Sequence, residues 1–143
     1  MNIDELKAEW AKDTDIGDDL GEEAIKCSRL HSKYIDLLIN SKLKLTQLEH
    51  NMAVHRAKMS KYYRGEMTKD ELNENNLTQW QYKTLKSDIP ELIEAEPEYQ
   101  KFQARVEYMK TMIYMLESIL GEIKSRNFTI RASIDWHKFR AGL

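Results

Sequence analysis

The chain contains neither glycine nor proline from Glu22 to Tyr63, and a stretch of this length without a breaker is typical of a long helix. Alternating steps of four and three residues trace a heptad-like seam through it. The seam consists of Cys27, His31, Tyr34, Leu38, Ser41, Leu45, Leu48, Met52, His55, Met59 and Tyr62. Gly65 follows at the position where a glycine commonly ends a helix. We therefore predict one helix over residues 21–64, about 60 Å long at 1.5 Å per residue.

A second seam begins after Pro97 and is more regular than the first. It consists of Tyr99, Phe102, Val106, Met109, Ile113, Leu116, Leu120 and Ile123. Proline favours the first turn of a helix, and Lys124 and Arg126 suit the negative end of the helix dipole. Asn127 is a residue type that can stop a helix. The pattern predicts a second long helix over residues 98–126.

The remaining segments are shorter and less regular. Residues 1–20 predict a short acidic helix that begins with a capping box, followed by a loop. Residues 66–97 predict an acidic connector with one or two short helices, and residues 128–143 predict a C-terminal assembly segment with a last short helix. We expect a single all-α domain, residues 1–143, in which the two long helices form an antiparallel helical hairpin.

A bare hairpin would leave apolar side chains uncovered. Two seams cannot both be buried around so narrow a core. The positions expected to stay partly exposed are Leu30, Leu37, Ile119, Trp136 and Phe139. Other copies of the chain would cover them, so we predict a homo-oligomer.

Charge alternates in blocks along the chain although its net value is only −2. Residues 1–23 hold two cations and nine anions, residues 24–65 nine and two, residues 66–98 three and nine, and residues 99–143 eight and four. Two basic blocks therefore lie between acidic ones. This asymmetry indicates either an anionic partner or pairing between blocks of opposite sign.

The end of the first basic block combines cations with aromatic rings. The stretch "HRAKMSKYYRG", residues 55–65, holds Arg56, Lys58, Lys61 and Arg64 around Tyr62 and Tyr63. Spaced cations bind a phosphate chain by releasing its counterions, and a solvent-facing tyrosine stacks on a base without reading its identity. Cations at a helix C-terminus are also common simply because they complement the dipole. On the first interpretation, a single-stranded nucleic acid binds without sequence preference to Arg56, Lys58, Lys61, Tyr63 and Arg64, with Tyr63 pointing towards solvent.

No residue pattern predicts catalysis. The chain has no glycine-rich phosphate loop, nucleophile motif or acidic metal cluster. Cys27 and His31 lie four residues apart, but two ligands do not complete a zinc site. The single cysteine favours a reducing, intracellular setting, and no apolar stretch approaches the roughly 20 residues of a membrane span. We expect no enzyme activity, no metal, no cofactor and no membrane partner.

The closing segment "IKSRNFTIRASIDWHKFRAG" resembles that of the UvsY family, the recombination mediator proteins of T-even-type phages. The matching positions are Lys124, Ser125, Arg126, Phe128, Ile130, Asp135, Phe139 and Gly142, with Asn127 in place of a glycine. The likeness spans most of the chain, including a long helix that reaches "YYRG" and an acidic middle with "WQYKTLKSD". The DNA-binding stretch of the family is a basic-Ala-basic triplet before Tyr-Tyr. Arg56-Ala57-Lys58 matches it with the two basic types in swapped order.

The resemblance implies a non-enzymatic protein that binds single-stranded DNA as a ring-like homo-oligomer, hexameric or heptameric. It implies a mediator that loads the phage recombinase UvsX onto DNA coated by the phage single-strand-binding protein, in recombination, recombination-dependent replication and repair. The setting would be the cytoplasm of the infected bacterial host. The C-terminal segment of the family is tied to self-assembly. Together with the uncovered apolar positions, this gives the expected oligomerisation residues Ile119, Lys124, Arg126, Phe128, Trp136 and Phe139.

An alternative from another functional class remains open. A coiled-coil structural adaptor, such as a virion assembly factor without DNA binding, would share the long helices. Its basic cluster would pair with the acidic middle of a neighbouring copy. Such an adaptor gains nothing from cations gathered beside Tyr62 and Tyr63, and salt-dependent binding of single strands separates the two classes.

Overall fold

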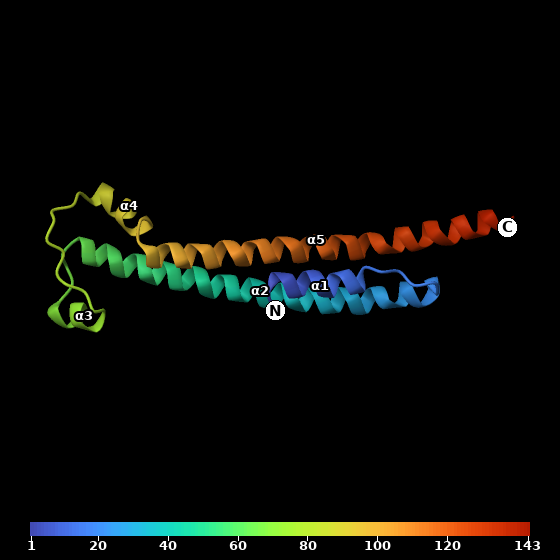
Figure 1. Cartoon of the computed structure of the whole chain (residues 1–143), viewed down its shortest axis with the longest axis horizontal. Helices are drawn as coiled ribbons and strands as arrows, with labels where there is room; N and C mark the ends of the chain where they lie inside the picture. Colours follow the sequence, from blue (N-terminus) through green and yellow to red (C-terminus); the bar gives the residue numbers. More distant parts are fainter. The chain divides into compact units, whose positions relative to one another are not determined.

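The regular structure of the chain is entirely helical in the computed structural model, which describes all 143 residues. Two helices of 44 residues each dominate it, α2 (Leu20–Tyr63) and α5 (Pro97–Arg140). The shorter elements are α1 (Ile3–Asp13), α3 (Lys69–Glu74), the 3-10 turn η1 (Lys86–Asp88) and α4 (Ile89–Glu94) (Figure 1). The predicted all-α class, with two long antiparallel packed helices and short additional ones, is confirmed. No helix has an apolar run long enough to cross a membrane.

The first of two compact units comprises Met1–Leu43 and Lys110–Leu143, and we call it the α1 unit. Here α1 lies against the first half of α2 (Figure 1). Leu6 is fully buried, and the ring of Trp10 meets that of Tyr34 edge-on with 5.5 Å between centroids. The predicted capping box at the start of α1 is also present. Apolar contacts therefore hold α1 on α2.

The long helix α5 does not stop at Asn127 as the sequence predicted, and the separate last helix is absent because α5 continues to Arg140. Ile123, Arg126 and Ile130 explain the difference. They are spaced three and four residues apart on one helix face and are only 3%, 5% and 2% exposed. Burial of this face on both sides of Asn127 outweighs the weak tendency of an asparagine to end a helix.

Arg126 connects three parts of the α1 unit. Its Nη1 donates to the carbonyl of Asp13 at 2.9 Å, and its Nη2 donates to the carbonyl of Asp15 at 2.9 Å. Nη2 also lies 3.3 Å from the carboxylate of Glu23 at the start of α2. The guanidinium thus satisfies carbonyls at the C-terminal end of α1, where no intrahelical partner exists.

Ile119 is buried, contrary to the sequence-based prediction. The sequence analysis predicted that it stays uncovered, yet only 3% of its surface is exposed in the folded chain. The expectation assumed two packed helices, whereas the α1 unit contains segments of three. Trp136 and Phe139 do remain exposed, at 57% and 73%. The last turns of α5 therefore carry part of the exposed apolar surface of the chain.

The second compact unit, Lys44–Met109, holds the connector, and we call it the connector unit. Its core consists of Met59, Ile89, Ile93 and Tyr99, against which Met52, Tyr62, Tyr63 and Leu77 pack. Gly65, two residues beyond the last residue of α2, takes a φ of 74°, as a helix-ending glycine does. Thr68 caps α3 by accepting a hydrogen bond from the backbone N–H of Glu71. The acidic connector thus folds onto the C-terminal end of α2.

Candidate nucleic-acid interface

The four cations predicted to bind DNA surround the last turns of α2 on different flanks. An α-helix turns about 100° per residue, so Arg56 and Lys58 project roughly 200° apart. Arg56 and Arg64 are separated by only about 80° around the helix and about 12 Å along it. The helix geometry therefore does not place all four cations in one patch.

Two of these cations are already engaged with carboxylates of the connector. The Nζ of Lys61 lies 2.9 and 2.8 Å from the two carboxylate oxygens of Glu71, and this hydrogen bonding lowers the pKa of Glu71. Arg64 Nη2 lies 3.3 Å from Glu66. Part of the predicted basic surface is therefore neutralised within the chain.

The other two cations keep their charge available. Arg56 Nη2 donates to the hydroxyl of Tyr99 at 2.5 Å, and its guanidinium lies 5.5 Å from the centre of that ring. The acceptor is a hydroxyl and not a carboxylate, so the contact orients Arg56 without pairing its charge with an anion. Lys58 makes no ion pair and lines a shallow hollow between α2 and the start of α5, beside His50 and Phe102. Arg56 and Lys58 are the stronger candidates for phosphate contacts.

Tyr63 does not point freely into solvent as predicted. Its hydroxyl donates to Glu96 at 2.8 Å, and the other oxygen of that carboxylate lies 3.0 Å from His55 Nε2. Burial, together with the bond to Glu96, raises the pKa of Tyr63. The Tyr63 ring meets Trp80 edge-on at 4.8 Å. No sequence pattern indicates that a residue 33 positions away holds this side chain.

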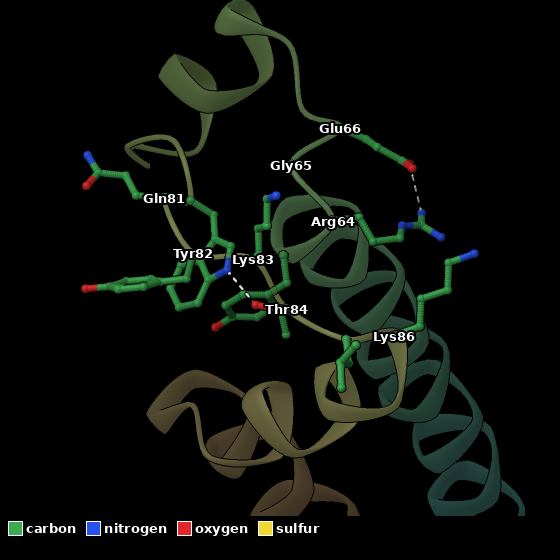
Figure 2. A pocket seen from close by; sticks show the side chains of 11 residues that line it. Arg64, Gly65, Glu66, Gln81, Tyr82, Lys83, Thr84 and Lys86 are labelled. Carbon is green, nitrogen blue, oxygen red and sulfur yellow. Dashed lines mark hydrogen bonds and ion pairs between the residues drawn. The ribbon is translucent and has the colours of Figure 1, made fainter.

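An open groove of about 650 Å³ lies where the connector crosses the end of α2, and we call it the connector groove (Figure 2). It is lined by Tyr63, Arg64, Gly65, Glu66, Trp80, Gln81, Tyr82, Lys83, Thr84, Leu85 and Lys86. The ring of Trp80 packs between Tyr63 and Tyr82, and its indole N–H donates to Thr84 at 3.0 Å. Of the predicted site residues, only Tyr63 and Arg64 reach this groove.

Sequence analysis missed the cations that the connector itself contributes. Lys83 and Lys86 are exposed and form no ion pair, and Glu66 is the single acid lining the groove. The sequence analysis counted charge over residues 66–98 as one block. That block is net negative, so its lysines were not considered as a basic site. A count over a shorter window would have found these lysines, since residues 77–87 contain two lysines and no acidic residue.

The predicted oligomerisation residues divide into two groups. Ile119 and Arg126 are buried within the chain, whereas Lys124 is exposed. Phe128, Trp136 and Phe139 are 74%, 57% and 73% exposed, and the last two rings stack with 5.7 Å between centroids. These three aromatic residues fall within an arc of about 80°. That arc lies opposite the face that Arg126 and its buried neighbours use inside the unit.

The site contains no group of three or more His, Cys, Asp or Glu side chains placed to hold a metal ion, and neither does the rest of the chain. What the interface offers is charge, aromatic surface and hydrogen-bond donors. These are the means by which proteins hold a polyanion.

Comparison with known proteins identifies the family. The family model described as "Recombination, repair and ssDNA binding protein UvsY" matches residues 9–143. The chain belongs to the UvsY family. UvsY proteins are non-enzymatic recombination mediators that bind single-stranded DNA, so the predicted function class is confirmed and the structural-adaptor alternative is not supported.

Solved structures agree with this assignment to the UvsY family. One crystal structure of the bacteriophage T4 recombination mediator protein UvsY, in lattice type II, is 25% identical, with a TM-score of 0.83 over 99% of this chain and 98% of that one. The lattice type IV structure is 24% identical, with a TM-score of 0.83 over 97% and 99%. No curated protein sequence matches the chain. The fold is therefore shared over essentially the whole length despite low identity.

Proposed function

We propose that this chain loads the phage recombinase UvsX onto single-stranded DNA coated by the phage single-strand-binding protein, in the cytoplasm of the infected bacterial host. The observation that carries the proposal is the match of the UvsY family model to residues 9–143. A mediator of this kind must hold a strand without reading its sequence, since recombination acts on any sequence. Cations and aromatic rings without a base-reading element meet that need.

The proposed strand contacts begin with Arg56 and Lys58, which are the two of the four cations at the end of α2 that no carboxylate compensates. Lys61 and Arg64 extend the path, with Glu71 and Glu66 holding them in place until a phosphate replaces the carboxylate. Tyr63 contributes as a fixed wall of the connector groove, because its hydroxyl is bound to Glu96. Since Arg56 and Lys58 lie on different flanks of α2, they contact different parts of one flexible strand or the strands of adjacent copies.

Assembly into a ring-like homo-oligomer of six or seven copies completes the proposal. Phe128, Trp136 and Phe139, together with Lys124, form the exposed face of α5 that a second copy covers. Ile119 and Arg126 serve assembly indirectly, by holding α5 straight within the α1 unit. A ring repeats the basic end of α2 and gives avidity greater than that of one site.

A recombinase-loading assay tests the mediator role. Purified UvsX is mixed with single strands saturated with single-strand-binding protein, and its strand-dependent ATP hydrolysis is followed with and without this protein. We expect the protein to shorten the lag before hydrolysis on coated strands and to have little effect on naked strands at low salt. An unchanged lag on coated strands at saturating protein would contradict the proposed function.

A further inference from the structure

We propose that the connector groove is a nucleobase-stacking subsite, in which Tyr82 stacks on an unpaired base of the bound strand while Lys83 and Lys86 contact the flanking phosphates. This inference rests on the proposed binding of single-stranded DNA. It assigns the stacking role to a residue outside the basic end of α2, and it transfers to Tyr82 the role that the sequence had suggested for Tyr63.

Exposure separates Tyr82 from the other aromatic residues of the groove. Tyr63 and Trp80 are half-buried, and each uses its polar atom inside the chain, on Glu96 and Thr84. Tyr82 is 72% exposed, and its hydroxyl has no partner. Its ring packs at 5.0 Å from Trp80 with 62° between the planes, so one edge is supported while a face stays open. In Figure 2 the Tyr82 ring extends outward from the connector.

The connector is fixed where it carries this ring. Tyr62 donates a 2.7 Å hydrogen bond from its hydroxyl to the carbonyl of Thr78, and Trp80 is held by Thr84 at 3.0 Å. The edge-on contact between Tyr63 and Trp80 joins the same segment to the end of α2. A stacking platform gains affinity when it is ordered before the ligand arrives, because less conformational entropy is lost on binding.

The positive charge of the connector groove suits the phosphates of a single-stranded nucleic acid. Lys83 and Lys86 have no partner within the chain, and Arg64 is the third cation of the lining. In Figure 2, Lys86 and Arg64 extend on the same side of the groove, away from Tyr82. The only opposing charge is Glu66, which lies 3.3 Å from Arg64 and occupies the place that a phosphate oxygen would take. An exposed ring and uncompensated lysines in the same groove can bind a single strand through a base face and its phosphates.

The test compares a short oligothymidylate with an abasic strand of the same length and charge, using fluorescence anisotropy at fixed salt. The parent protein should bind the base-bearing strand more tightly, by about 5- to 150-fold for each stacked base. Tyr82→Ala should remove most of that preference and leave the salt dependence unchanged. Tyr82→Phe keeps the ring and should restore the preference.

The cations are tested separately. Lys83→Ala with Lys86→Ala should keep the preference for bases and flatten the log–log salt slope by about 0.7 for each phosphate that is no longer neutralised. Glu66→Gln should tighten binding several-fold because it releases Arg64. All the substituted positions are exposed, so circular dichroism should show unchanged helix content.

Two results would overturn the inference while leaving the proposed function standing. In one, Tyr82→Ala keeps the full preference for base-bearing strands. In the other, it binds strands normally and loses only recombinase loading, which would assign the surface to a protein partner. Failure of the parent protein to bind any single strand would instead contradict the proposed function itself.

Discussion

The hydroxyl of Tyr63 donates a 2.8 Å hydrogen bond to the carboxylate of Glu96, and this bond joins the end of α2 to the turn before α5. His55 occupies the second oxygen of the same carboxylate at 3.0 Å. One acidic side chain thus fixes two residues of α2 and sets the wall of the connector groove. Tyr63 is in the first place a structural anchor.

Removing that hydroxyl should destabilise the fold. Tyr63→Phe leaves one Glu96 oxygen without its partner, and we expect a loss of about 1 kcal/mol in the free energy of unfolding. The midpoint of urea unfolding measures it. Tyr82→Phe is the matched control, because that hydroxyl is exposed and unpartnered. Equal midpoints for Tyr63→Phe and the parent would show that the bond adds nothing.

Arg126 should hold α1 in place. Arg126→Met keeps much of the side-chain length but leaves the carbonyls of Asp13 and Asp15 without this donor and the carboxylate of Glu23 without this cation. Removing the guanidinium leaves these three oxygen acceptors without their shared partner, so α1 should open more readily. Hydrogen exchange should rise across α1, whereas the exposed Arg131→Met should leave it unchanged. Retained protection of α1 in Arg126→Met would contradict this role.

Two carboxylates of α1, those of Glu9 and Asp13, should make the stability of the protein sensitive to acid. The hydrogen bond from Lys33 lowers the pKa of Glu9. For Asp13, burial raises the pKa, but hydrogen bonds from Lys33 and Tyr34 outweigh it and the pKa is lowered. Lowered folded-state pKa values stabilise the protein above the ordinary carboxyl range near pH 4, and this stability is lost as the pH falls through the folded values.

The free energy of unfolding should therefore decline as the pH falls below about 5, and Lys33→Met should flatten that decline. Urea titrations at a series of acidic pH values measure both slopes. Lys42→Met serves as a control, since the cation of Lys42 lies 3.7 Å from an exposed carboxylate, that of Glu117. If the free energy of unfolding of Lys33→Met fell with pH as steeply as that of the parent, Glu9 and Asp13 would not be the cause of the decline.

Assembly should depend on the exposed face of α5. Trp136→Ala with Phe139→Ala should lower the mass measured by light scattering and leave helix content intact, because both side chains are more than half exposed within the chain. Ile119→Ala is the contrasting variant, since truncating a buried isoleucine costs about 2–5 kcal/mol of stability. Full-mass oligomers from the double variant would exclude this face from assembly.

Much of the fold could be predicted because it follows from short-range rules. Heptad spacing identified both long helices, and Gly65 and Pro97 marked an end and a start that the structure confirms. The error at Asn127 arose because a weak local stop signal competes with burial by partners that are remote in the sequence. Arg126 binds backbone carbonyls 113 and 111 positions away, and carbonyls carry no sequence signature.

The contacts around the predicted site residues could be predicted less well for a related reason. A sequence shows how many cationic residues a segment contains, but it does not show which of them form ion pairs in the folded chain. Lys61 and Arg64 are held by Glu71 and Glu66, whereas Lys83 and Lys86 are free within a connector that is acidic on average. Which charges remain available depends on tertiary contacts.

The salt dependence of single-strand binding tests the central claim most directly. Affinities of the parent and of Arg56→Ala with Lys58→Ala are measured by anisotropy over a range of salt concentrations. The double variant should keep its helix content and oligomeric mass, bind more weakly, and show a log–log slope flatter by about 0.7 for each phosphate that the missing cations neutralise in the parent. An identical slope in parent and variant would mean that these two side chains are hydrated at the end of α2 and contact no phosphate. The strand would then bind elsewhere.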